Sequence, residues 1–403
     1  MSVDPYYGVL WVPGGQGVWT TTLAAHQQLV SGVSTLPASW WPDEDHAWDR
    51  LTCSRYLPVV LATLGVINSW RTTTIAQVCA FTGSPRSRAV IRWAFRVGMV
   101  DIGVHVHGLS KTVDEDTYLV RPSASAVWRN KFLPSLSYPE RVYLMGGRNV
   151  LGGSRTDRHN VLTTEASLRA STLLGVGAIA GEALSSADLL AGSGLGRKGM
   201  QSSGTWTADA TWLRDDGLRI AVETQASSTP HLTQKVRRWG DLLNRRTLYS
   251  SGLVVLFVIA APPDSSDSRR SSITKRIKES LDGWEDSSVD DAPHRIFTAS
   301  WTDFFPAANQ ASPDFSSLTA NSIAGDTVHL AGAQMDISGH LAGAVQTINT
   351  LAQSPAHLRG EGVNLWTRPL VDRGLTQPPA PLVAPAHHYT DSQYPSMTGQ
   401  GRR

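Results

Sequence analysis

The stretch TADATWLRDDGLRIAVETQAS, Thr207 to Ser227, predicts two strands joined by a tight turn. Residues 206–214 and 218–225 alternate between apolar and polar side chains, as half-buried strands do. Between them, Asp215-Asp216-Gly217 supplies residues that favour a turn. Side chains at every other position of a strand point to the same face, so this hairpin places polar groups of its two strands side by side.

Acidic side chains in and around this hairpin form the candidate site. Glu223 and Gln225 share one face of the second strand, and the hairpin can bring Asp209 beside Glu223. Two carboxylates on adjacent strands offer the hard oxygen ligands that Mg²⁺ prefers, so Asp209 and Glu223 are the candidate metal ligands. Glu182 adds a third carboxylate, predicted on a helix before the hairpin, and Lys235 lies on the helix after it.

The helix after the hairpin is basic, because it also carries Arg237 and Arg238. A carboxylate pair beside such a helix is the arrangement that a metal-dependent phosphodiesterase needs. The metal polarises the phosphate and lowers the pKa of a bound water, and the cations hold the DNA backbone. The alternative is a surface hairpin whose acidic side chains are simply solvated.

The segments around the hairpin predict an α/β domain over residues 155–305. The expected elements are helices at 161–174 and 178–190, the two hairpin strands, a helix at 231–246, a strand at 252–261, a helix at 268–281 and a strand at 295–301.

Residues 49–135 predict a winged helix-turn-helix. Helices are expected at 55–70, at 73–81 and from Ser84 to about residue 97, where Ser84-Pro85 is a helix-start signal. Two strands at 100–106 and 117–120, with the polar loop 108–116 between them, would form the wing.

Arginines mark one face of the third predicted helix. Arg88, Arg92 and Arg96 recur every four residues and form one stripe, with Arg86 just before it. Such a helix can enter the major groove of double-stranded DNA, where guanidinium groups reach phosphates or base edges. The alternative is a helical bundle with a solvated basic face that contacts protein.

The remaining segments and the composition set limits on the class of protein. We expect residues 1–48 to be an arm or linker, 136–154 a connector, and 306–403 a flexible low-complexity tail with a short helix near 329–352. The longest aliphatic run, Leu253 to Ala261, is too short to span a bilayer, and the start of the chain does not have the pattern of a secretory signal. With only two cysteines, the chain fits the cytoplasm, and no membrane partner is expected.

The hairpin resembles the motif of the restriction-endonuclease-like fold, PD-(D/E)xK, in which an aspartate opens one strand and Glu-x-Lys lies on the next. The whole arrangement is similar to the replication-relaxation family of mobile-element proteins, which joins a winged helix to such a domain. The segments RHNVLTTEASLRAS, Arg158 to Ser171, and GEALSS, Gly181 to Ser186, also resemble that family. Here Gln225 stands where the fold usually has lysine. The resemblance implies that Lys235 takes the displaced role and that Glu182 matches the fold's helix glutamate.

Three functions follow as hypotheses from an α/β multidomain chain of this kind. The first is a DNA-binding protein that acts in the replication or maintenance of a plasmid or other mobile element. The second is a Mg²⁺-dependent endonuclease or nickase that uses Asp209 and Glu223, with Gln225 orienting a water and Lys235 supplying charge. The third is a scaffold that recruits replication proteins of the same element.

Overall fold

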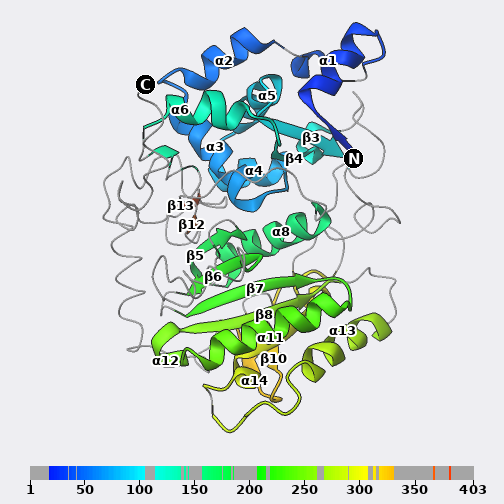
Figure 1. Ribbon diagram of the computed structural model, residues 1–403, viewed down its shortest axis with the longest axis vertical. Helices are drawn as coiled ribbons and strands as arrows, with labels where there is room; N and C mark the ends of the chain where they lie inside the picture. Colours follow the sequence, from blue (N-terminus) through cyan, green and yellow to red (C-terminus); the bar gives the residue numbers. More distant parts are fainter. Residues whose placement is uncertain are drawn as a thin grey trace.

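The protein is represented by a computed structural model. It describes residues 18–34, 36–41, 43–104, 114–137, 140–141, 144, 157–174, 176–182, 185, 207–214, 218–260, 267–288, 290–306, 312–314, 317–330, 366–367 and 381–382. The described chain is of mixed α/β class, with helices and two sheets (Figure 1). Most of the connector expected at 136–154 and most of the segment expected to be a helix near 329–352 lie outside the described residues.

The N-terminal part, up to residue 137, packs helices against a small antiparallel sheet with the strand order β1-β3-β4-β2. Its elements are β1 (Val18–Thr20), α1 (Thr22–Val30), η2 (Ala38–Trp40), α2 (Glu44–Thr52), α3 (Leu57–Trp70), β2 (Thr73–Thr74), α4 (Ile75–Thr82), α5 (Ser87–Arg96), β3 (Val100–Val104), η3 (Glu115–Thr117), β4 (Leu119–Pro122), η4 (Trp128–Phe132) and α6 (Leu133–Ser135).

Local signals account for the boundaries of these helices. Thr74 begins α4 with a capping box, in which its hydroxyl and the side chain of Gln77 each accept a backbone N–H. Gly83, at φ 62°, ends α4, and Gly98, at φ 78°, follows the end of α5. Helix α5 begins at Ser87 rather than at Ser84-Pro85, because Ser84 caps a preceding turn by accepting the amide of Arg86 at 3.3 Å.

The segment expected to be an arm or linker is folded onto the N-terminal part. β1 extends the small sheet by pairing with β3, and α2 packs against α5. Trp40 is fully buried, with its ring centroid 5.6 Å from that of Phe95 and 5.8 Å from that of Tyr118. Large aromatic side chains bury much apolar area. This stretch therefore contributes core contacts even though its sequence shows little helix or strand periodicity.

The second sheet has the strand order β11-β10-β9-β8-β7-β6-β5-β12-β13. Strands β5, β6 and β7 are antiparallel, and β7, β8 and β9 are parallel, so each parallel step needs a helical crossover. The elements of this part are α8 (Asp157–Leu173), β5 (Val176–Gly181), β6 (Ala210–Arg214), β7 (Arg219–Gln225), α11 (Pro230–Asn244), α12 (Leu248–Ser251), β8 (Leu253–Ile259), α13 (Asp267–Glu279), α14 (Ala292–Arg295), β9 (Ile296–Ser300), α15 (Trp301–Phe304), β10 (Thr319–Ser322), β11 (Thr327–His329), β12 (Trp366–Thr367) and β13 (Pro381–Leu382).

Two predicted elements of this part are wrong. Of the helix expected at 178–190, residues 178–181 instead belong to strand β5, which pairs with β6. Residues 319–329, expected to belong to a flexible tail, form the hairpin β10–β11, which adds to the sheet edge beside β9. Strands β12 and β13, from the same expected tail, pair at the opposite edge.

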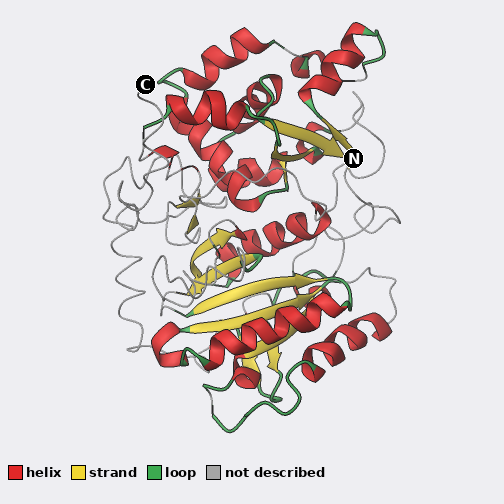
Figure 2. Ribbon diagram, in the orientation of Figure 1, coloured by secondary structure: helices red, strands yellow, loops and turns green. Residues whose placement is uncertain are grey.

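Helices cover both faces of the second sheet (Figure 2). α11 and α13 pack on one face, over a core that includes Val236, Phe257 and Ile277. α8 packs on the other face, where the hydroxyls of Thr163 and Thr224 lie 2.6 Å apart. β7 and β8 therefore lie between two helical layers, which explains the continuous apolar run of β8.

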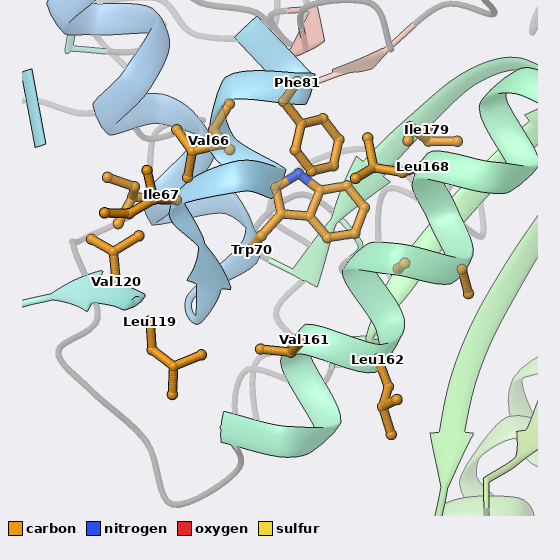
Figure 3. Packing of buried hydrophobic residues seen from close by; sticks show 14 of the residues in the cluster. Val66, Ile67, Trp70, Phe81, Leu119, Val120, Val161, Leu162, Leu168 and Ile179 are labelled. Carbon is orange, nitrogen blue, oxygen red and sulfur yellow. The ribbon is translucent and has the colours of Figure 1, made fainter. Parts of the chain in front are cut away.

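Helix α8 also packs against the N-terminal part, so it is shared by both halves of the molecule. Figure 3 shows Trp70 and Phe81 facing Val161 and Leu168 of α8, and all four are buried in one hydrophobic cluster. Polar contacts reinforce this junction. Gln77 Nε2 donates to Glu165 Oε2 at 3.1 Å and to the Val161 carbonyl at 3.2 Å.

Among the described helices, none is by itself both long enough and apolar enough to cross a membrane. One pair, α2 with α3, meets the length and composition test together and is bent by 103° at its break.

Candidate active site

Asp209 and Glu223 lie directly opposite each other on neighbouring strands. β6 and β7 pair with Ala210 opposite Val222, so the residue before Ala210 meets the residue after Val222. The Asp209 amide donates to the Val222 carbonyl at 3.0 Å, and the Thr224 amide donates to Asp209 Oδ2 at 2.8 Å. The predicted hairpin therefore forms, with both acidic side chains at one end of it.

The Glu223 carboxyl is buried, with none of its side chain exposed. Its Oε2 accepts from Lys235 Nζ at 2.6 Å, and its Oε1 accepts from the Trp239 indole N–H at 2.7 Å. Lys235 and Trp239 are four residues apart on α11, so both face the same strand. The Lys235 ammonium also lies 4.0 Å from Asp209 Oδ2. This cation thus bridges the two carboxyls.

His159 joins the site from α8, and the sequence reasoning did not single it out. Its Nε2 lies 2.9 Å from Asp209 Oδ1, and about a quarter of its side chain is exposed. The segment from Arg158 to Ser171 carried part of the family resemblance, and His159 is inside it. That resemblance was the available signal, because the periodicity of α8 gives no reason to choose one polar residue.

Glu182 lies at the edge of the site, in a 3-10 turn directly after strand β5. Its Oε1 is 2.9 Å from Arg71 NH1 of the N-terminal part and accepts from the Thr207 hydroxyl at 3.3 Å. The charges of Asp209 and His159 act on the Glu182 carboxyl, so it belongs to the same cluster of ionisable groups. Burial is the main cause that raises the pKa of Glu182.

Electrostatics drives the pKa values of the two central acids apart. Burial, followed by the neighbouring Asp209 carboxylate, raises the pKa of Glu223 to about 8. Burial also pushes the pKa of Asp209 upward, but His159 and Lys235 outweigh it and hold that pKa below its usual range. The closeness of the two carboxyls itself lowers the pKa of Asp209 and raises that of Glu223.

Three other predicted site residues lie apart from these acids. The Gln225 amide donates to the Ser227 carbonyl beyond the end of β7. Arg237 donates to the Ser280 carbonyl at 3.2 Å, and Arg237 and Arg238 are both on the exposed side of α11. Lys235 is the cation of α11 that reaches the carboxyls.

The arginine stripe of α5 lies on the surface but is paired within the molecule. Arg88 makes a two-point contact with Asp116, at 2.6 Å for each bond, and Arg92 makes a similar contact with Glu115. Both acids belong to the turn η3. Arg96 donates to the Ser39 carbonyl at 2.8 Å. The NH1 of Arg96 also lies 3.9 Å from Asp43 Oδ2. Of the four arginines predicted to contact DNA on and just before α5, Arg86 is the exposed one.

The two central acids retain capacity to ligate a divalent cation. Within the described ranges, no group of three or more His, Cys, Asp or Glu side chains is arranged to hold a metal. Mg²⁺, however, is commonly held by one or two carboxylates together with substrate phosphates. Each carboxylate oxygen has two lone pairs, so the contacts of Asp209 and Glu223 leave positions for a further ligand. The donor set fits Mg²⁺.

Comparisons with protein-family models, with curated proteins and with solved structures each give no match for this chain.

Proposed function

We propose that this chain is a DNA-processing protein that cleaves phosphodiester bonds with a divalent cation. The observation that carries the proposal is the convergence of Asp209, Glu223 and Lys235 at one end of β6 and β7. Paired carboxylates with an adjacent ammonium supply the oxygen ligands and the positive charge that phosphodiester hydrolysis requires. The displaced lysine expected from the resemblance is supported by the 2.6 Å contact of Lys235 with Glu223.

The order of elements supports the same proposal. The run α3, β2, α4, α5, β3, β4 has the arrangement expected of a winged helix-turn-helix, with α5 as the recognition helix. The run α8, β5, β6, β7, α11, β8 carries an aspartate before one strand and a glutamate on the next, as the restriction-endonuclease-like motif does. We therefore assign the two halves to DNA binding and to nuclease chemistry.

Asp209 and Glu223 would hold Mg²⁺, which supplies polarisation of the phosphate and an acidified water when it is bound. Lys235 would place its positive charge beside the phosphate during cleavage. His159 holds Asp209 in position at 2.9 Å, and Trp239 holds Glu223 at 2.7 Å. These neighbours fix the orientation of both carboxyls before any ligand arrives.

The direct test is cleavage of supercoiled plasmid DNA by the full chain in Mg²⁺ or Mn²⁺. We expect Asp209→Asn to abolish cleavage and Lys235→Met to slow it about 10²- to 10³-fold, the range for loss of one electrostatic donor. Asp241→Asn is the matched control, because this acid of α11 is exposed. Cleavage that survives Asp209→Asn would refute the assignment.

A second candidate is a DNA-binding protein that keeps the nuclease-like fold without cutting. The observation that favours it is Gln225, which stands where the motif usually has lysine and whose side-chain amide donates to the Ser227 carbonyl. The family resemblance would place such a protein in the replication or maintenance of a mobile element. This candidate predicts salt-dependent binding of duplex DNA by the wild-type chain without any cleavage product, and equal affinity for Asp209→Asn.

A further inference from the structure

The turn between α3 and β2 has a strained backbone at Arg71. Its φ is 63° and its ψ is −67°, and the Thr72 amide donates across it to the Trp70 carbonyl at 2.8 Å. These values define a γ-turn of the rare, strained type. Among the described residues, Arg71 is the one non-glycine with a positive φ. Glycine would adopt this conformation without strain, so an arginine here needs a reason.

The surroundings hold this turn rigidly. The buried Trp70 ring stacks on Phe81, with centroids 4.9 Å apart. On the other side, the buried Thr72 donates its hydroxyl to Asp157 Oδ1 of α8 at 3.0 Å. Both flanking residues are thus anchored, and the Arg71 side chain is directed out of the N-terminal part.

The Arg71 guanidinium reaches the edge of the candidate active site. Its NH1 lies 2.9 Å from Glu182 Oε1, and a quarter of its side chain is exposed. Its Nε is buried and has no hydrogen-bond partner among the described residues. The approach is close, because a β-carbon on Gly181 would lie 2.5 Å from the Ser69 carbonyl oxygen. A cation of the N-terminal part therefore stands beside the acids of the second sheet.

We propose that Arg71 binds a backbone phosphate of the DNA that enters the site, exchanging its contact with Glu182 for the phosphate oxygens. Guanidinium groups match phosphate and carboxylate with the same geometry, so Glu182 holds the position that the phosphate takes. The inference rests on the proposed function for the identity of the ligand. It makes the site composite, with the carboxyls and Lys235 from one part of the molecule and Arg71 from the other.

The test measures the affinity of full-length protein for a short DNA duplex as a function of salt. It uses the Asp209→Asn background, so that no cutting occurs. Adding Arg71→Gly removes the guanidinium and relieves the turn. We expect the slope of log K against log salt to become shallower by about 0.9, the value for one phosphate contact. Arg169→Ala, which removes an exposed arginine of α8 that is paired with Glu165, is the charge-matched control and should leave the slope unchanged.

A second variant separates loss of the contact from loss of the fold. Arg71→Gln keeps the strained backbone and much of the side chain but has no charge, so it should lower the slope by the same amount. An unchanged slope in both variants, or an equal change in Arg169→Ala, would overturn the inference. If the slope falls as expected while the wild-type chain cuts no DNA, the phosphate contact stands and the proposed cleavage fails.

Discussion

At the scale of single residues, the central acids were predictable and their partners were not. Strand alternation and hairpin pairing are local rules, and they placed Asp209 opposite Glu223 correctly. His159 and Arg71 come from distant segments, and only the packing of α8 against both parts brings them near the acids. A local pattern cannot specify such contacts. The helix expected at 178–190 was wrong at residues 178–181, which form strand β5, and Glu182 lies in a 3-10 turn directly after that strand.

The protonation of Glu223 should give the stability of the metal-free protein a distinctive pH dependence. Its pKa is about 4.3 in an unfolded chain and is raised to about 8 in the fold. Between these values the folded state binds more protons than the unfolded state, so the free energy of unfolding falls as pH rises. The expected contribution is about 1 kcal/mol per pH unit.

Glu223→Gln should remove this contribution. The check is urea unfolding of both proteins in EDTA at several values between pH 5 and pH 8. The difference in unfolding free energy between variant and wild type should grow in favour of the variant as pH rises. A difference that stays constant across this range would show that Glu223 does not carry the proton.

At the scale of elements, small residues and short-range pairing explain the misassigned segments. Strand β5, VGAIAG, is made of small and apolar residues that fit a helix or a buried strand equally well, and only pairing with β6 decides between them. The elements with strong start and stop signals were predicted closely. α4, α5 and α11 all lie within a few residues of their expected positions.

The turn η3 should weaken DNA binding by α5, because its acids hold the arginines that would contact phosphates. We expect Glu115→Gln with Asp116→Asn to tighten binding of duplex DNA about tenfold, since two surface ion pairs of up to about 1 kcal/mol each are released. The measurement is a fluorescence-anisotropy titration at fixed salt. The charge-matched control is Asp282→Asn with Glu285→Gln on the far side of the second sheet. An equal gain in the control would assign the effect to net charge alone.

At the scale of the whole molecule, the two halves share one hydrophobic cluster through α8. The cluster runs from Trp70 and Phe81 across Leu168 to Ile179 of the second sheet (Figure 3). The sequence indicated separate units at 49–135 and 155–305, but its local patterns could not show that the boundary between them is a packed core. The contacts that decide this join residues about a hundred positions apart, and neither periodicity nor turn signals report on them.

Leu168→Ala should therefore destabilise both halves together. Leu168 is buried at the junction, and removing its side chain should cost about 2–5 kcal/mol. Hydrogen exchange of the full chain is the measurement, because it follows α4 and β7 separately. We expect protection to fall in both elements by similar factors. Loss of protection in β7 alone would mean that the halves unfold independently.

Because one face of α8 is buried against the N-terminal part, that part is not expected to be stable when it is expressed without α8. An open reading frame that stopped at residue 137 would encode a polypeptide with the indole of Trp70 and the ring of Phe81 turned toward water. Such a polypeptide would expose apolar surface and should therefore be prone to aggregation and proteolysis. Fusing the N-terminal part to another protein should therefore require α8 to be transferred with it.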